Sequence, residues 1–287
     1  MNKTIKTSLY ANAASLGLNW VYNIPYLERL NKSEDLIFQP IDPAKYKRAR
    51  KAVMGYPNAK VGDVSLQGNI LKWVVQALEE NPELTQEDYK TVIYEKIKPG
   101  GVYEGWVESY GKKLIFNTMI NNMELKREPL EQNDDQMVGL VPYYATKSLG
   151  LSNDIAWNLT QAFSTNEDYK LFFNVFDQLT DALKTQSMND ALKDSLNYIP
   201  AHYGFKLNMA LNVDHPKDIL KIVSNACAIG YAIPLVYTIL FHTDSFEDAL
   251  RLNTMMGGAS SDRGNLIGFL YSFNQAIDDD TLNKVNL

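Results

Sequence analysis

The chain is poor in the residues that most often build reactive centres, with three histidines and one cysteine among its 287 residues. A single cysteine excludes an internal disulfide and a cysteine-based zinc site. We interpret Cys227, which lies in the apolar run 226–239, as a buried and inert thiol. The histidines are scattered without an i,i+4 pair, so a histidine metal motif has no support.

Long apolar runs and a surplus of positive charge are also missing. No stretch approaches the roughly 20 apolar residues that cross a bilayer, and the best candidate, 229–241, is short and contains Pro234. Residues 1–18 lack the apolar centre and the cleavage site of a signal peptide. The net charge of −6 disfavours a broad nucleic-acid surface. We therefore expect a cytoplasmic protein with no membrane or nucleic-acid partner.

Helical periodicity is what the sequence has in abundance. Apolar residues recur at three- and four-residue steps along most of the chain, and strand-like alternation is nearly absent. This pattern predicts an all-α fold in a single domain, residues 1–287, with long loops at 22–63 and 98–105. The predicted helices cover residues 4–17, 65–80, 86–96, 106–121, 137–149, 153–163, 167–184, 188–199, 215–231, 234–241, 245–256 and 261–275.

The most informative motif opens the last predicted helix. Gly257 and Gly258 precede Ser260, Ser261 and Asp262, and an apolar segment follows at 265–273. Glycines allow a ligand to approach the backbone, and the free N–H groups of a helix start favour an anion such as a diphosphate. The hydroxyl and carboxylate oxygens also suit a hard cation. Simple helix capping explains the same residues without a ligand.

Two other helix starts carry acidic residues. Asp63 occupies the expected N-cap position ahead of the helix at 65–80, and Ser65 follows two residues later. Capping accounts for this pair, and so does ligation of a divalent cation. An acidic cluster with Asp134 and Asp135 opens the helix at 137–149, either as a solvated cap or as part of a site.

Two further segments are candidates for ligand contacts. Five cations lie within residues 45–51, as a solvated charge run or a phosphate contact. An aromatic-polar turn at 16–23 ends the first helix, and it contains Asn19, Trp20 and Tyr22. Its aromatic rings would stack on a purine or fill the core. Known nucleotide and hydrolase fingerprints, including the P-loop and G-x-S-x-G, do not occur.

The order of these motifs resembles the ADP-ribosylglycohydrolase family. A G-D-A-L-G-like helix end is echoed by A-S-L-G at 14–17, a D-D-T-like helix start by G-D-V-S at 62–65, and an N-G-x-x-M-R-x-x-P-like element by 134–142. The closest similarity is to a branch that begins with L-G-L-H-W-I-Y-D and ends with G-G-D-S-x-x-R-G. This chain has L-G-L-N-W-V-Y-N at 16–23 and G-G-A-S-S-D-R-G at 257–264.

The resemblance implies an all-helical hydrolase that releases ADP-ribose from a protein side chain or a small acceptor. It implies catalytic roles for two aspartates, Asp63 and Asp262, and it places the diphosphate on the Gly257-Gly258 backbone. The implied metal ligands are Asp63, Ser65, Ser261 and Asp262. The implied substrate-binding residues are Asn19, Tyr22, Asp134, Asp135, Gly257, Gly258 and Ser260.

The chain departs from the family at the positions that hold two magnesium ions. Ala259 and Ser261 replace two aspartates, and Gly139 replaces an arginine of the middle motif. Because the remaining ligands carry too little negative charge for two divalent cations, we expect fewer than two magnesium ions. Two functions stay open. The first is hydrolysis of an N- or O-glycosidic bond in an ADP-ribosylated substrate, and the second is a catalytically inactive protein that binds ADP-ribose or a related nucleotide, or has a structural role.

Overall fold

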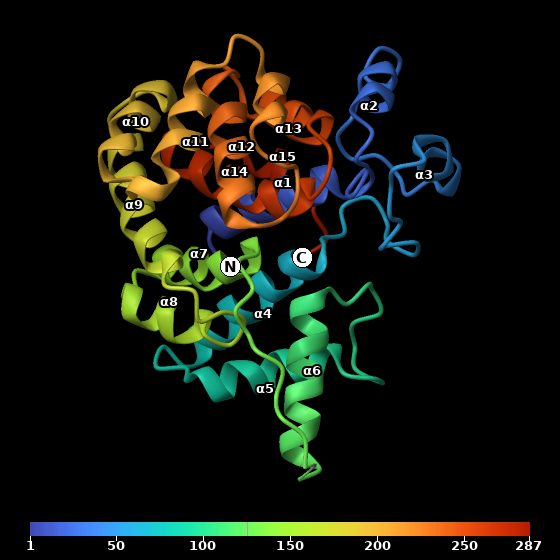
Figure 1. Ribbon diagram of the computed structural model, residues 1–287, viewed down its shortest axis with the longest axis vertical. Helices are drawn as coiled ribbons and strands as arrows, with labels where there is room; N and C mark the ends of the chain where they lie inside the picture. Colours follow the sequence, from blue (N-terminus) through green and yellow to red (C-terminus); the bar gives the residue numbers. More distant parts are fainter. Residues whose placement is uncertain (125) are drawn as a thin grey trace.

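A computed structural model describes residues 1–124 and 126–287, and Figure 1 shows an assembly of helices. No β-strand occurs within these residues, only isolated bridges such as that between Val21 and Gly258. The α-helices are α1 (Lys3–Leu16), α2 (Ile24–Leu30), α3 (Pro43–Ala49), α4 (Leu66–Glu80), α5 (Gln86–Ile97), α6 (Ser109–Asn122), α7 (Val141–Leu149), α8 (Asn153–Thr160), α9 (Asp168–Leu183), α10 (Met188–Ser195), α11 (Ala201–Asn212), α12 (Ile229–Phe241), α13 (Phe246–Met255), α14 (Ser260–Asn274) and α15 (Asp279–Leu282). Shorter 3-10 turns are η1 (Met137–Leu140), η2 (Leu196–Tyr198) and η3 (Pro216–Lys221).

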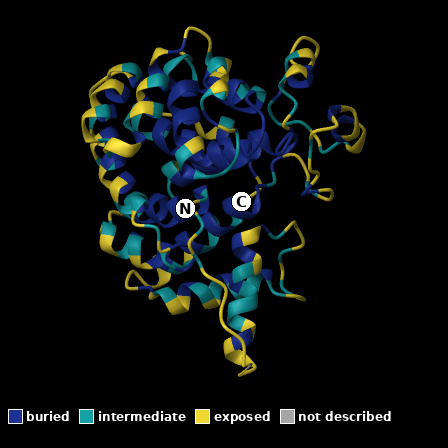
Figure 2. Ribbon diagram, viewed as in Figure 1, coloured by how far each residue is buried: buried dark blue, intermediate teal, exposed yellow. Residues whose placement is uncertain are grey.

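The first helix and the last long helix, α1 and α14, pack together at the centre of the fold. Gly264 lies so close to α1 that a Cβ there would stand 2.4 Å from the Ala11 carbonyl oxygen, and a Cβ on Gly268 would stand 2.3 Å from that of Thr7. The pairing of 264 with 11 and of 268 with 7 makes the helices antiparallel. Both helices are almost entirely buried in Figure 2. Glycine is therefore required at this contact.

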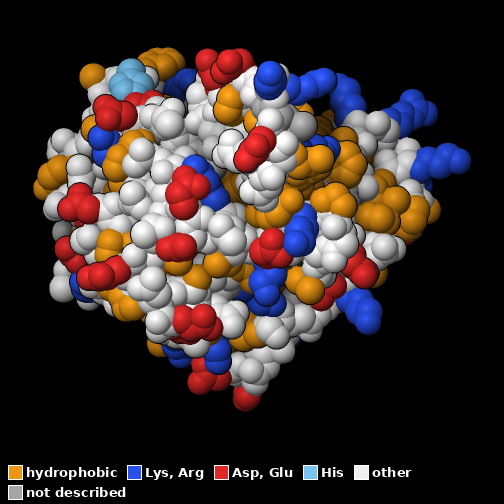
Figure 3. All heavy atoms as spheres, turned by 90° about the horizontal axis from the view of Figure 1, so that it is seen from below, with side chains coloured by type: hydrophobic (Ala, Val, Ile, Leu, Met, Phe, Trp, Pro, Cys, Tyr) orange, Lys and Arg blue, Asp and Glu red, His pale blue; other side chains and the backbone are white. Residues whose placement is uncertain are grey.

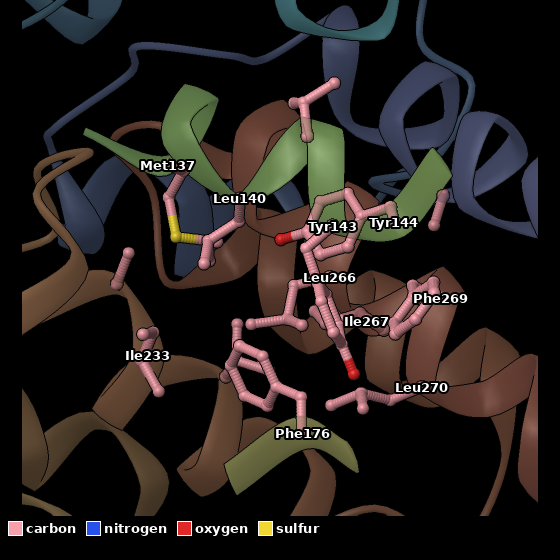
Figure 4. Packing of buried hydrophobic residues seen from close by; sticks show 14 of the residues in the cluster. Met137, Leu140, Tyr143, Tyr144, Phe176, Ile233, Leu266, Ile267, Phe269 and Leu270 are labelled. Atoms are coloured by element: carbon pink, nitrogen blue, oxygen red, sulfur yellow. The ribbon is translucent and has the colours of Figure 1, made fainter. Parts of the chain in front are cut away.

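Aromatic and aliphatic side chains from surrounding helices complete the core. Tyr143 of α7 stacks on Phe173 of α9 with ring centroids 5.0 Å apart, and Tyr144 packs on Phe269 of α14 at 4.9 Å. Figure 4 shows how these residues of α7 converge with Leu266, Leu270 and their neighbours. Burial of such large apolar surfaces is the main driving force for folding. The cluster includes residues from Ile5 to Val285 and so joins both ends of the chain.

Residues 22–54, which we call the arm, stand to one side of this body and carry α2 and α3 (Figure 1). The arm has a small apolar cluster of its own, centred on Leu27 and Tyr46. It is anchored to the body by hydrogen bonds from both Nε and Nη2 of Arg251 to Asp35, each 3.1 Å long. The Tyr46 hydroxyl also donates to the Asn19 carbonyl at 2.9 Å. These contacts fix the arm beside the end of α1.

The all-α prediction is confirmed, but three of its details are wrong. The segment 22–63 is not one long loop, because α2 and α3 form there. Asn23 and Asp42 cap them, and each helix has a proline in its first turn. Helix α11, which follows Pro200, was also not predicted.

The predicted helix at 215–231 is the third wrong detail. The structure has a 3-10 turn at Pro216–Lys221, and α12 starts at Ile229 with Pro234 inside it. Proline removes the N–H that would bond to the Gly230 carbonyl, and that oxygen accepts from Lys206 Nζ at 3.3 Å instead. A side chain from α11 thus makes the internal proline tolerable. No helix among the described residues has the length and apolar character to cross a membrane.

Candidate active site

The Gly257-Gly258 loop turns the chain from α13 into α14. Both glycines have positive φ, 64° and 68°. Their N–H groups do not face a free space, since Gly257 donates to the Thr254 carbonyl at 3.0 Å and Gly258 to the Val21 carbonyl at 2.8 Å. The two N–H groups are therefore already bonded within the protein, and the contact of this backbone with a diphosphate stays a prediction. The glycines serve to bring α14 against the end of α1.

Polar side chains at the start of α14 are buried without partners. The hydroxyls of Ser260 and Ser261 make no hydrogen bond, although both residues are fully buried. Asn19 accepts a hydrogen bond from the Ser261 N–H at 3.1 Å, so it supplies the capping interaction, while its own Nδ2 has no partner. Buried polar atoms are normally satisfied by protein, water or a ligand. This point of the fold therefore has unused hydrogen-bonding capacity.

Asp262 belongs to the same helix start, and its side chain is buried with one carboxylate oxygen, Oδ1, unpartnered. Burial raises the pKa of Asp262 to about 7, against the opposing effects of the neighbouring Arg263 charge and the nearby Ser65 hydroxyl. Ser65 is the true N-cap of α4 and accepts from the Gly68 N–H and from Asn12 Nδ2. The prediction that Asp63 caps this helix is thus wrong.

Glu108 is a site residue that the sequence analysis missed. It is buried at the start of α6, where the hydroxyls of Tyr110 and Tyr56 donate to its Oε1 at 3.1 and 3.3 Å. Burial raises the pKa of Glu108 well above its usual range, and the negative charge of Asp262 raises it further. Two carboxyl groups therefore interact in one buried region. The only signal in the sequence is an acid directly after the apolar pair Trp106-Val107, which has no motif spacing.

Asp63 lies on the outer side of this region. Its carboxylate accepts from the Lys60 N–H at 2.7 Å and from Nδ2 of Asn286 at 2.8 Å. It lines a cavity of about 360 Å³ together with Tyr56, Tyr103 and Trp73. Because Tyr56 also reaches Glu108, its ring separates this cavity from the buried carboxyl groups. The carboxyl that interacts with Asp262 is Glu108.

Three other residues that the sequence predicted for the site are Tyr22, Asp134 and Asp135, and the structure shows the surroundings of each. Tyr22 is partly exposed beside Asp262 and Arg263, and burial raises its pKa, with a contribution from Asp262. Asp134 forms an ion pair with Lys113 at 2.9 Å, which favours the reading of that residue as a charge-paired surface group. The Asp135 carbonyl accepts from the Ile229 N–H, next to Cys227.

Cys227 is less isolated than expected. Cys227 is only partly buried as a residue. Burial of its thiol and the charges of Asp262 and Glu108 raise the pKa of that thiol. The raised pKa keeps the thiol protonated, in agreement with an inert role. The middle motif also approaches the site, because the Met137 N–H donates to the Cys227 carbonyl at 2.9 Å and Gln136 contacts Ser109, which adjoins Glu108.

The donor set fits two magnesium ions poorly. In the described part of the chain, no three or more His, Cys, Asp or Glu side chains gather in a group that would hold a metal ion. Asp262 is flanked by the buried cation of Arg263, and its serine neighbours bring no charge. No model of a known protein family matches the chain, and no curated protein sequence matches it significantly. The family resemblance therefore rests on the motif order alone.

Proposed function

We propose that this protein hydrolyses an N- or O-glycosidic bond of an ADP-ribosylated substrate, with Glu108 and Asp262 as its acid and base. The observation that carries the proposal is a pair of buried carboxyl groups, Asp262 in the predicted α14 motif and Glu108 at the start of α6, whose charges interact. Two tyrosine hydroxyls donate to Glu108. Glycoside hydrolysis uses a pair of carboxyl groups, one protonated and one ionised. The motif order supplies the ADP-ribosyl part of the proposal.

The two environments assign the roles. Glu108 stays protonated because burial and the Asp262 charge both raise its pKa, so it acts as the proton donor. Asp262, with a pKa of about 7, is ionised in a large fraction of molecules at neutral pH and acts as the base. Water adds to the anomeric carbon and gives its proton to Asp262. The bond to the leaving nitrogen or oxygen breaks, and that atom takes the proton of Glu108.

The cavity beside Tyr56 is the space in which we place the substrate, and the Tyr56 ring must move aside for Glu108 and Asp262 to reach it. Its volume of about 360 Å³ is within the usual range for small-molecule sites. The rings of Trp73 and Tyr103 pack edge to face in its wall, with their centroids 6.1 Å apart. Lys72 and Asp63 add one positive and one negative charge to the wall. The Tyr56 hydroxyl, which donates to Glu108, connects the cavity wall to the proton donor. We derive no step through magnesium because the ligand set fits it poorly.

The test is release of ADP-ribose from ADP-ribosylated arginine, serine and free nucleotide-sugar substrates by the wild-type protein and by Glu108→Gln, Asp262→Asn and Asp63→Asn variants. Loss of an acid or base should lower kcat by about 10²- to 10⁴-fold in the first two variants. Asp63→Asn leaves the buried pair intact but removes a charge from the cavity wall, so it should change KM more than kcat. Asp181→Asn, at an exposed acid that pairs with Lys184 outside the cavity, is the matched control. Full activity of Glu108→Gln together with loss in Asp63→Asn would reject the acid-base pair in favour of the aspartates that the motifs suggested.

A second candidate function is ligand binding without turnover, and the deep burial of the Glu108 and Asp262 carboxyl groups favours it. Glu108 is 6% and Asp262 1% exposed, so neither meets a substrate without movement of the residues that cover them. An inactive binder would be stabilised thermally by ADP-ribose, by an amount that follows its concentration relative to Kd and does not depend on magnesium. Turnover of any substrate in the panel would eliminate this candidate.

A further inference from the structure

The arm carries a surplus of positive charge on an otherwise acidic protein. Residues 22–54 contain seven lysines and arginines and four acidic residues, a net charge of +3 in a chain whose net charge is −6. The rest of the chain therefore carries −9. Charge separated in this way creates a local positive potential that attracts anions.

All four acidic residues of the arm are already paired. Glu34 pairs with Lys45 and Asp42 with Arg48 inside the arm. Two cations of the body neutralise the others, since Lys217 pairs with Glu28 and Arg251 with Asp35. Five arm cations consequently have no ion-pair partner among residues 1–124 and 126–287, and every one of them is exposed. They are Arg29, Lys32, Lys47, Arg50 and Lys51.

Exposed apolar side chains lie close to two of these cations, Arg50 and Lys51. Val53 and Met54 follow Arg50 and Lys51 after one intervening alanine, with 49% and 36% of their surfaces exposed, and Tyr22 is 37% exposed. On the side where Figure 1 has α2 and α3, Figure 3 shows projecting lysine and arginine side chains next to hydrophobic ones. A surface that combines cations with apolar side chains offers both attraction and contact area.

Hydrogen bonds connect this surface to the candidate active site. The Tyr22 N–H donates to the Lys51 carbonyl at 2.7 Å, and the Val53 N–H donates to the Trp20 carbonyl at 3.0 Å. The Val21 carbonyl, directly before Tyr22, accepts from the Gly258 N–H at 2.8 Å, and the Trp20 ring packs on Tyr56 with centroids 5.5 Å apart. A partner bound to the arm would therefore lie at the rim of the site.

We propose that the exposed edge of the arm, from Lys47 to Met54 with Tyr22, binds an acidic polypeptide segment that also carries apolar side chains. This inference rests on the proposed function only in naming that polypeptide as the carrier of the hydrolysed group. The paired acids leave cations that complement acidic side chains, and the apolar neighbours complement the peptide's own apolar residues. A nucleic acid fits less well, because the body is strongly negative and the cations occupy one short segment.

The test is fluorescence anisotropy of the whole protein with a labelled peptide rich in Glu and Phe, at low and at high salt. The Lys47→Glu/Arg50→Glu/Lys51→Glu variant should bind at least about tenfold more weakly than wild type, and binding should weaken with salt. The matched control, Lys170→Glu/Lys184→Glu/Lys193→Glu, changes the net charge equally on α9 and α10. It should bind within about threefold of wild type, since these lysines lie outside the arm.

The neutral Lys47→Gln/Arg50→Gln/Lys51→Gln variant, with its fold checked by circular dichroism, separates loss of attraction from added repulsion and should also bind more weakly. No peptide binding, equal weakening in the control variant, or equal affinity for an uncharged peptide would overturn the proposal. Tighter binding of a single-stranded oligonucleotide than of the peptide would overturn it as well. These measurements need no turnover, so their failure and the failure of the hydrolase proposal are separate results.

Discussion

Glu108 and Asp262 are far apart in the sequence, but their carboxyl groups lie in one buried region where the charge of Asp262 raises the pKa of Glu108. The first residue precedes α6 and the second lies in the first turn of α14. Two buried acids that share so little solvent cannot both ionise without a large cost in free energy. The relationship makes the protein sensitive to pH in a defined direction.

We expect the free energy of unfolding to fall as pH rises. The folded-state pKa of Asp262, about 7, lies above its ordinary value of 3.8, so the folded protein holds this proton more tightly. The resulting stability is complete below pH 4 and is lost as pH rises through about 7, by an amount on the order of a few kcal/mol. Urea unfolding of wild type and Asp262→Asn between pH 4 and 8 measures it. The variant should show a flatter profile, and an unchanged slope would contradict the assignment.

The contact between α1 and α14 predicts a strong effect of one added methyl group. Gly264→Ala would place Cβ against the Ala11 carbonyl, so we expect a loss of about 2 kcal/mol or more in the free energy of unfolding. Gly204→Ala is the matched control. Nothing lies within 4 Å of a Cβ at that helical position, and the substitution should stabilise by about 0.5–1 kcal/mol. Thermal or urea unfolding distinguishes the two, and similar stability of both variants would refute the close packing.

The hydrogen bonds of Arg263 predict how far the free energy of unfolding falls when this buried cation is removed. Its guanidinium donates to the side chain and carbonyl of Asn253 at 3.0 and 3.1 Å, and to the carbonyls of Gly257 and Asn225 at 2.6 and 3.4 Å. Arg263→Met leaves these acceptors unpaired, so we expect a loss of about 3 kcal/mol or more. Arg251→Met, at a partly buried surface site with three carboxylate partners, should cost about 1 kcal/mol. Equal losses in urea unfolding would show that Arg263 has no special structural role.

Magnesium should bind weakly, with at most one ion per chain. The unpartnered oxygens at the start of α14 belong to two serines and a single aspartate, and Arg263 adds a repelling charge beside them. Isothermal titration calorimetry of wild type and Asp262→Asn measures both stoichiometry and affinity. Asp262→Asn should abolish whatever binding exists. Two tightly bound ions in the wild type would restore the dinuclear centre that the motif order implies.

The sequence determined the helical character of the protein and most helix positions. Its three- and four-residue apolar spacing correctly predicted helices such as α4 and α9, because that spacing places one face of a helix against the core. The same reasoning found the motif at the start of α14, where Ser260, Ser261 and Asp262 have unused polar atoms. Local signals of this kind need no knowledge of distant contacts.

Tertiary structure decided which acids meet. The sequence paired Asp262 with Asp63, but Asp63 bonds Asn286, near the end of the chain, and Glu108 takes the place beside Asp262. Tertiary contacts also decided that Pro234 lies within α12, because Lys206 reaches the carbonyl that proline leaves free. A side chain's partner across the core depends on the packing of whole helices. No short-range pattern carries that information, so it appeared only in the folded molecule.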